Sequence, residues 1–266
     1  MTWDLQWDDE VDVVCTDAGI AGLAGAISAV DGGAEVLVAC APGPDAAVAG
    51  SGHPGWFPLR SGDTETATYF AELSGDLDEA VLPQREDDLP IRQAPEAVAA
   101  AGRRIPPFVG SQLRDWNARC IASPSGYLYT RVTDWTSAAM KTSDGDAIEV
   151  TEIGAMTPGA GGIVGSVLEW LDAEADRRGV DLYPVTRLER LVFDERDVIG
   201  AVFTTADGPW AVRARHGVLF CRAGSPDVRP PRLPGCGDPV LRVALVGKAA
   251  SRFGRVELVT SDPAVG

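Results

Sequence analysis

The feature that most constrains the fold is residues 11–42, where apolar and small residues follow one another in the order of a strand, a helix and a second strand. Residues 11–16 have the apolar character of a short strand, and residues 35–40 that of a second, buried strand. Between them, residues 19–30 are mostly small and apolar, as in a helix that packs closely on a sheet. The segment therefore predicts a βαβ unit and an α/β fold.

The turn between the first strand and the helix matches two of the three glycines in G-x-G-x-x-G, the fingerprint of dinucleotide-binding βαβ units. The second glycine, here Gly19, lets the backbone approach a pyrophosphate, and the third, here Gly22, lets the helix pack on the strand. The first glycine is replaced by Asp17, which Ala18 follows. A carboxylate here conflicts with a diphosphate, because the diphosphate binds at the N-terminus of the helix.

A second departure lies at the end of the second strand. A ribose-binding Asp or Glu is expected about 20 residues beyond the glycines, but this chain has Cys40 at the end of that strand. A thiol cannot replace a carboxylate that accepts two hydrogen bonds from hydroxyl groups. We therefore expect a degenerate nucleotide site, and its residues are Asp17, Ala18, Gly19, Gly22, Cys40 and Arg222.

Two of these side chains have a second interpretation. Asp17 is also suited to cap the helix, which would stabilise it by about 1 kcal/mol and fill the anion site from within. Arg222 follows the last strand expected in this region. It either contacts a phosphate or forms an ion pair with a carboxylate such as Asp17, and the ion pair is the alternative that we favour.

Residues 12–27 resemble the FAD-binding domain of the superfamily that contains fumarate reductase, the succinate dehydrogenase flavoprotein and 3-ketosteroid dehydrogenase. The resemblance returns at residues 162–224, in the order of the family's helix, strand, β-meander and returning strand. It is weaker at residues 50–73, where the family has a Gly/Ser-rich loop and a helix. The resemblance implies an α/β fold with a Rossmann-like, FAD-binding-type parallel sheet, a β-meander and a small inserted β-rich lobe.

The resemblance also implies a division into domains. Residues 1–75 and 156–225 would form a discontinuous Rossmann-like domain, and residues 76–155 an inserted cap-like lobe of about half the usual size. Residues 226–266 would form a C-terminal extension with a helix and a short strand. We expect that helix over residues 238–253, either docked on the chain's own sheet or presenting an apolar face to a partner.

Shorter elements are expected from apolar runs and turn residues. Residues 76–105 are polar and interrupted by prolines, which predicts surface loops with one small helix. Helices are expected to begin at Asp63 and to end at Gly179. The expected strands are residues 127–132, the two runs flanking 143–146, and residues 187–193, 198–204, 210–214 and 217–221.

Charge and cysteine usage restrict the partners. The net charge of −16 repels phosphate backbones and anionic lipids, so we expect no nucleic acid and no membrane partner. The first ten residues lack the features of a signal peptide, which predicts a cytoplasmic protein. The five cysteines are odd in number and lack C-x-x-C spacing. Cys15, Cys40 and Cys221 could form a thiolate metal or redox site, but buried cysteines in parallel strands are the interpretation that we favour, and we predict no metal.

Candidate catalytic residues are few. His53 and His216 are the only histidines, and we interpret both as structural. Tyr127 and Tyr129 share one face of a predicted strand, which is more typical of packing than of a substrate site. The family's closing segment, whose backbone reaches the flavin ring, has no match after Gly224. We therefore predict no catalytic residue in this chain.

These observations favour a degenerate flavoprotein-like module that lacks independent redox catalysis. It would act as a binding or regulatory subunit, with another protein or with a second copy of itself as the partner. We expect no bound cofactor, and FAD if there is one. Two alternatives stay open. One is an FAD-dependent oxidoreductase of the steroid or dicarboxylate type, completed by a partner chain, and the other is a carrier that uses the old nucleotide cleft for a different small molecule.

Overall fold

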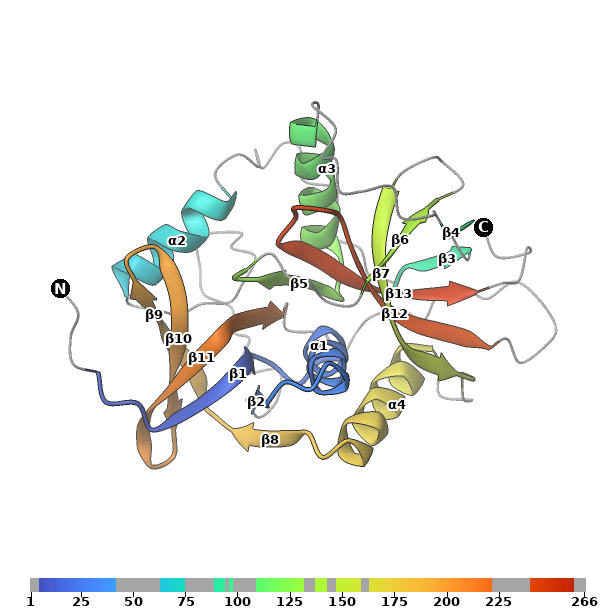
Figure 1. The fold of residues 1–266 in the computed structure, drawn as a ribbon. Coiled ribbons are helices and arrows are strands. Elements are labelled where there is room, and N and C mark those ends of the chain that lie inside the picture. Colours follow the sequence, from blue (N-terminus) through green and yellow to red (C-terminus); the bar gives the residue numbers. More distant parts are fainter. Residues whose placement is uncertain are drawn as a thin grey trace.

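The computed structural model describes residues 5–41, 63–74, 89–93, 96–97, 109–131, 137–142, 147–158, 163–221 and 240–260. Across these ranges, thirteen strands form one continuous sheet in which the main path runs β4-β6-β7-β12-β13-β5-β11-β1-β2-β8 (Figure 1). The strands are β1 (Asp9–Cys15), β2 (Val36–Cys40), β3 (Ile91–Gln93), β4 (Glu96–Ala97), β5 (Gly126–Tyr129), β6 (Ala138–Lys141), β7 (Ala147–Met156), β8 (Asp181–Pro184), β9 (Arg187–Asp194), β10 (Asp197–Thr205), β11 (Gly208–Cys221), β12 (Leu241–Gly247) and β13 (Phe253–Thr260). The helices are α1 (Ile20–Asp31), α2 (Thr64–Ser74), α3 (Val109–Ala122) and α4 (Ile163–Arg177).

The predicted βαβ unit is confirmed. β1 pairs in parallel with β2 on one side and with β11 on the other, and β2 pairs in parallel with β8. These four strands form the Rossmann-like part of the sheet, and α1 crosses from β1 to β2. Fully buried residues such as Val14 and Val38 explain the continuous apolar runs, because strands covered on both faces need no polar alternation.

The meander is also confirmed, with one correction. β9, β10 and β11 pair antiparallel in sequence order. The runs 210–214 and 217–221, predicted as two strands, are one strand, β11, which pairs with β10 at its start and with β1 further along. The pairing with β1 shifts register opposite Ala214 and Gly217, where Gly217 has a φ of +133°. The residues at this irregularity are polar, and their polarity is the reason that the sequence predicted two strands in place of one.

The predicted helix over residues 238–253 is wrong. Residues 241–247 form β12, which pairs antiparallel with β7 and with β13. Leu241, Val243 and Leu245 point to one side of the sheet, and Ala244 and Val246 point to the other. Because both faces are buried, the strand lacks the polar alternation that distinguishes a strand from a helix.

The β-rich lobe at residues 76–155 needs two corrections of its elements. A helix that was not predicted, α3, covers residues 109–122 and buries Trp116 and Cys120. Part of the segment predicted as surface loops is internal, because Leu89 is 1% exposed and β3 pairs in parallel with β13. The hairpin flanking residues 143–146 is confirmed as β6 and β7, although the turn itself lies outside the described residues.

The lobe's strands are hydrogen-bonded into the main sheet. β5 lies between β11 and β13 and is antiparallel to both, and it ends at Tyr129, before the predicted Val132. β7 continues the same sheet on the far side of β12. The domain boundaries given above stay a prediction, but the described strands of the three predicted segments share one sheet.

Two layers of helices cover the sheet. α1 and α4 lie on one side of it, and α2 and α3 on the other (Figure 1). The cluster beneath α1 and α4 contains Leu23, Leu171 and Leu219, and the opposite cluster contains Trp116 and Phe220. The sheet therefore has a core on each face, as expected of an α/β protein.

The helix boundaries follow the sequence signals. Asp63 caps α2, because its carboxylate accepts a hydrogen bond from the Thr66 N–H at 2.8 Å. α4 buries Val167 and Leu171, while Leu168 is 40% exposed. Beyond α4, Gly179 has a φ of +69°, as a residue that ends a helix commonly does.

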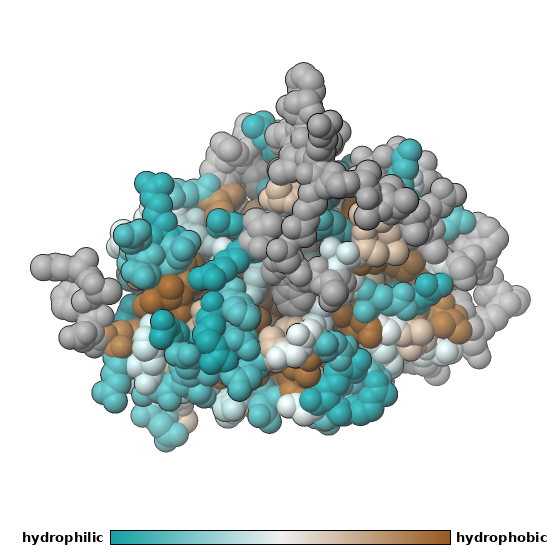
Figure 2. Space-filling view, viewed as in Figure 1, coloured by the Kyte–Doolittle hydropathy of each residue, from teal (hydrophilic) through white to brown (hydrophobic). Residues whose placement is uncertain are grey.

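The exterior is mostly polar. Figure 2 shows a largely hydrophilic surface over the described residues of this face, with apolar side chains in small separate patches. Among the helices that the structure describes, none is both long and apolar enough to cross a membrane.

Candidate functional site

The candidate site lies where β1, β2 and β11 reach their carboxyl ends, the edge at which α/β sheets bind ligands. Asp17 follows β1 and starts the turn into α1. Its carboxylate accepts a hydrogen bond from the Gly19 N–H at 3.1 Å, so the side chain forms an Asx turn with the backbone two residues on. Gly19, and not Asp17, is the N-cap residue of α1. Within the described part of the chain, no side chain caps the first turn of that helix.

Gly22 allows α1 to lie against the end of β1. A Cβ added at Gly22 would lie 1.7 Å from the carbonyl oxygen of Asp17 and 3.3 Å from Sγ of Cys221. One turn further, a Cβ added at Gly25 would lie 2.3 Å from Cδ2 of Leu219. The role predicted for the third glycine of the fingerprint, close packing of helix on strand, is therefore seen at Gly22.

Asp17 is partly buried, and its burial changes the pKa of its carboxyl group. Burial raises the pKa of the Asp17 carboxyl above its usual value, although the N–H groups of Gly19 and Ala18 act in the opposite direction. The buried carboxylate and a bound diphosphate would repel each other in a site of low dielectric constant. The arrangement accepts an anion more readily when Asp17 is protonated.

Cys40 lies at the end of β2, as predicted, and is partly exposed. Burial, followed by the negative charges of Asp17 and Asp172, raises the pKa of the Cys40 thiol. Asp17 and Asp172 of α4 therefore lie close enough to Cys40 for their negative charges to act on its thiol. A protonated thiol offers no strong acceptor for the two hydroxyls of a ribose.

The neighbouring thiols are also protonated at neutral pH. Burial raises the pKa of Cys15 to about 12. Burial, together with Cys15 and Asp17, raises the pKa of Cys221 well above its usual value. Because the thiolate is the form that binds metals and attacks electrophiles, these thiols are suited to packing. The residues described by the structure contain no group of three or more His, Cys, Asp or Glu side chains placed to hold a metal ion.

The remaining predicted residues fall into two groups. Arg222 and His53 lie outside the described residues, so neither the phosphate contact nor the ion pair of Arg222 is tested. His216 is 66% exposed, and its Nε2 lies 3.8 Å from Oδ1 of Asp12, near the middle of β1. The hydroxyl of Tyr129 donates a hydrogen bond to the His216 carbonyl oxygen at 3.0 Å. Tyr127 is partly buried and packs against the cluster beneath α1 and α4, which also contains Tyr129.

Two further residues of the site, Thr16 and Asp172, were not predicted from the sequence. The Thr16 N–H donates to the Leu219 carbonyl oxygen at 3.0 Å, which ties the turn to β11. Asp172 comes from α4, far along the chain. The position of Asp172 on the α4 helix could be predicted from the sequence, because it lies four residues after Leu168. Its approach to Cys40 could not, because it depends on how that helix packs.

The backbone and the side chains of this edge differ in how well they suit FAD, the cofactor implied by the resemblance. The tight crossing of α1 over β1 at Gly22 suits a dinucleotide. The Asp17 carboxyl and the Cys40 thiol stand where the fingerprint has a glycine beside the pyrophosphate and an acidic residue on the ribose.

Comparison with family models matches residues 12–241, most of the chain, to a family described as "FAD binding domain". A comparison with curated protein sequences finds no match.

Solved structures similar to this chain include three flavoprotein or reductase folds. The 3-ketosteroid-Δ4-(5α)-dehydrogenase of Rhodococcus jostii shares 22% identity over 82% of this chain and 47% of its own, with a TM-score of 0.37. The open conformation of a flavocytochrome c3 fumarate reductase shares 16% identity over 78% of this chain and 33% of its own, with a TM-score of 0.32. A geranylgeranyl bacteriochlorophyll reductase-like protein of Thermoplasma acidophilum shares 13% identity over 93% of this chain and 56% of its own, with a TM-score of 0.32. The chain thus spans about half of these proteins' length, or less.

Proposed function

This chain belongs to the FAD binding domain family, and on that premise we propose that it is a flavoprotein-like module that holds FAD weakly and acts as a binding or regulatory subunit of an oxidoreductase. FAD is the cofactor of the family, so the proposal concerns the strength of binding and not the kind of ligand. Redox catalysis would then depend on residues that another chain supplies.

One observation carries the proposal. The Asp17 carboxylate is partly buried and holds the Gly19 N–H, in the turn where family members need a backbone amide and no negative charge. An ionised carboxylate beside a diphosphate costs binding free energy, and a single unfavourable charge contact of about 1.4 kcal/mol lowers affinity about tenfold. Cys40 adds to this, because it does not supply the acceptors that hold a ribose.

The absorbance spectrum of the purified protein tests the proposal directly. We expect a preparation without stoichiometric flavin, and an FAD affinity, measured by titration, that is weak at neutral pH. Affinity should increase as the pH is lowered from neutral, because Asp17, whose pKa is raised, becomes neutral in that direction. A yellow protein that keeps one flavin per chain through gel filtration would overturn the proposal.

Substitutions at the two unsuitable positions sharpen the test. Asp17→Gly combined with Cys40→Glu should increase FAD affinity by about tenfold or more, since it restores both fingerprint residues. The double variant leaves the net charge unchanged, because it removes one carboxylate and adds another. Asp17→Gly alone removes one carboxylate, and its control is Asp207→Asn, which removes one exposed carboxylate in the turn between β10 and β11. An equal gain in these two single variants would mean that net charge, and not the site, limits binding.

The second candidate is an FAD-dependent oxidoreductase of the steroid or dicarboxylate type that a partner chain completes. Gly22 favours it, because the close crossing of α1 and β1 that family members use for the nucleotide is retained. In that case FAD titration would give tight binding in the unmodified protein at neutral pH. The partner chain would have to supply the residues that select the substrate of such an enzyme.

A further inference from the structure

A polar cavity lies where β3 runs beside β13. Arg92 and Gln93 line it from β3, Arg255 and Glu257 line it from β13, and Thr142 lines it from the residue after β6. Its volume is about 240 Å³, far above the roughly 15 Å³ that one water molecule needs. Gln93 is exposed, so a ligand can reach the cavity from solvent.

This cavity is separate from the nucleotide turn. Val256 and Leu258 belong to the cluster beneath α1 and α4. Arg255 and Glu257 alternate with them along β13 and therefore point to the opposite face of the sheet. On that face the Arg255 guanidinium lies 5.7 Å from the centre of the Trp116 ring of α3. In addition, β5 and β11 stand between β13 and β1, the strand that leads into the nucleotide turn.

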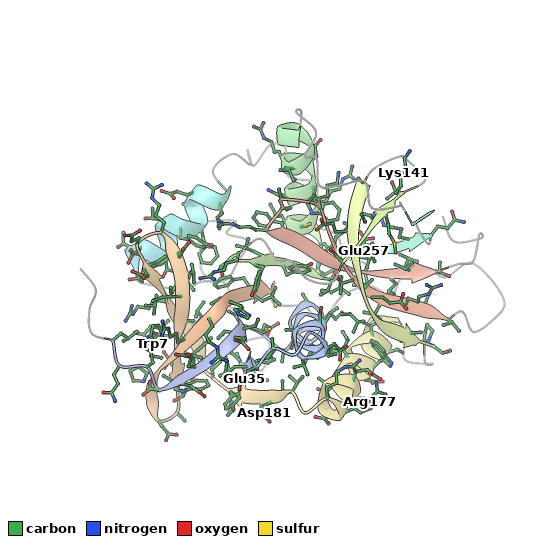
Figure 3. The ribbon with its side chains drawn as sticks, viewed as in Figure 1. Trp7, Glu35, Lys141, Arg177, Asp181 and Glu257 are labelled. Carbon is green, nitrogen blue, oxygen red and sulfur yellow. The ribbon has the colours of Figure 1, made fainter. Side chains whose placement is uncertain are left out.

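Glu257 holds the two arginines of the cavity in position. It lies on β13 (Figure 3), and its carboxylate accepts hydrogen bonds from Nε of Arg92 at 2.5 Å, from Nη2 of Arg92 at 3.0 Å and from Nε of Arg255 at 2.8 Å. A guanidinium has five N–H donors, so it can bond to Glu257 and to a further anion at the same time. Charged groups that are already positioned lose less entropy when a ligand binds.

The charge and the donors of the cavity favour an anion. Among its described lining residues, two arginines and one glutamate give a net charge of +1, in a chain whose net charge is −16. Thr142, which is 8% exposed, adds a hydroxyl, and Gln93 adds an amide, and both groups can donate hydrogen bonds. A positive cavity in an acidic protein concentrates small anions at one place.

We propose that this cavity binds a small tetrahedral oxyanion, either free phosphate or the phosphate group of a small ester. Arg92 and Arg255 would bond to its oxygens from two neighbouring strands, and Thr142 from the end of a third. A planar carboxylate is matched by one guanidinium, whereas a tetrahedral anion has oxygens in several directions and uses donors from all three segments. Glu257 would hold the arginines without touching the ligand. The proposal does not depend on FAD binding.

Equilibrium dialysis with radiolabelled inorganic phosphate, at constant ionic strength, tests the proposal. We expect one phosphate per chain. Arg92→Gln should weaken binding about tenfold, because the ligand loses a hydrogen bond from a charged group. Thr142→Val should weaken it about threefold, because one neutral donor is lost. The second variant keeps both arginines, so it tests the site even if Arg92→Gln destabilises the fold.

The matched control is Arg242→Gln on β12. Arg242 is 45% exposed and pairs with Glu152, so the control removes the same charge away from the cavity and should bind phosphate like the unmodified protein. The absence of saturable phosphate binding would overturn the proposal, and so would an equal loss in Arg92→Gln and in the control. Thermal melting of each variant confirms that the comparison is made on folded protein.

Competition against the labelled phosphate identifies the kind of anion. Glycerol 3-phosphate that displaces the label at least as well as unlabelled phosphate would assign the cavity to a phosphate ester, and weaker displacement would assign it to free phosphate. Acetate should displace the label about tenfold less well than phosphate, because it lacks the oxygens that meet the donors of a second strand. Displacement by acetate that equals displacement by phosphate would overturn the proposal of a tetrahedral ligand.

Discussion

The carbonyl oxygen of Asp17 lies so close to Gly22 that a Cβ on Gly22 would be only 1.7 Å from it. Gly22→Ala should therefore separate α1 from β1 and lower the free energy of unfolding by about 3 kcal/mol, at the upper end of the cost of overpacking. Gly247→Ala is the control, because its Cβ would meet no atom within 4 Å. Urea denaturation measures both, and similar losses in the two variants would refute the importance of the close crossing.

The raised pKa of Asp17 predicts how stability depends on pH. A carboxyl whose pKa is higher in the folded state favours folding when protonated, and this contribution is lost as the pH rises through the folded-state pKa. Asp17→Asn should therefore raise the free energy of unfolding at neutral pH, and the gain should shrink toward pH 4, near the group's ordinary value of 3.8. Urea denaturation at several pH values, with Asp207→Asn beside it, tests this. A gain that does not change with pH would contradict the prediction.

A buried ion cluster on β13 predicts the opposite pH dependence. Glu257 lies on β13 (Figure 3) and is fully buried, and its carboxylate accepts hydrogen bonds from Arg92 at 2.5 Å and from Arg255 at 2.8 Å. Burial alone would raise the pKa of Glu257, but the hydrogen bond from Arg92 and the charges of both arginines outweigh it, so the pKa is lowered. The carboxylate thus stabilises the fold above its ordinary pKa of 4.5, and this contribution is lost as the pH falls through the lowered value.

Glu257→Gln should lower the free energy of unfolding by about 3 kcal/mol at neutral pH, the usual cost of removing one partner from a buried pair. It should also weaken the loss of stability in acid. The control is Glu152→Gln, since Glu152 is 52% exposed and lies 3.5 Å from Arg242, and its removal should change little. Chemical denaturation of both variants at neutral and acid pH decides, and an equal effect of the two substitutions would refute the prediction.

The burial of β12 predicts that charged substitutions in this strand unfold the protein. Leu241 is 0% and Leu245 6% exposed within the chain's own core. Leu241→Asp combined with Leu245→Asp should therefore unfold the protein, at a cost of more than about 4 kcal/mol. Arg242→Gln, on the same strand but 45% exposed, should remain folded. Circular dichroism and sedimentation measure the outcome, and folded monomers formed from a larger assembly would instead make this surface an interface.

The parts of the fold that could be predicted from sequence are those with local signals. The βαβ unit follows from two apolar runs around a small-residue helix, and the meander follows from turns such as that at Gly208, which has a φ of +123°. β12 was mistaken for a helix because Leu241 and Leu245 also fit helical spacing. Val243 and Val246 were the opposing signal, since β-branched residues favour strands. The helix α3 was missed, although Trp116 and Cys120 already stood four residues apart.

The candidate site was predictable in its residues but not in its geometry. The sequence left Asp17 as either a cap or a charge conflict, and the hydrogen bond to Gly19 makes it an Asx turn beside the cap position. The proximity of Asp172 to Cys40 could not be predicted, because it depends on where α4 packs.

The position of β11 affects how the protein is made. β1 leaves the ribosome about 200 residues before its parallel neighbour, residues 208–221, as the pairing of Asp9 with Val212 shows. Until then, one edge of β1 has no native strand to pair with, and exposed strand edges of nascent chains tend to aggregate. Pairing of β1 with β11 must therefore wait until the segment between them has been translated, and chaperones that shield β1 until then would raise the yield of native protein.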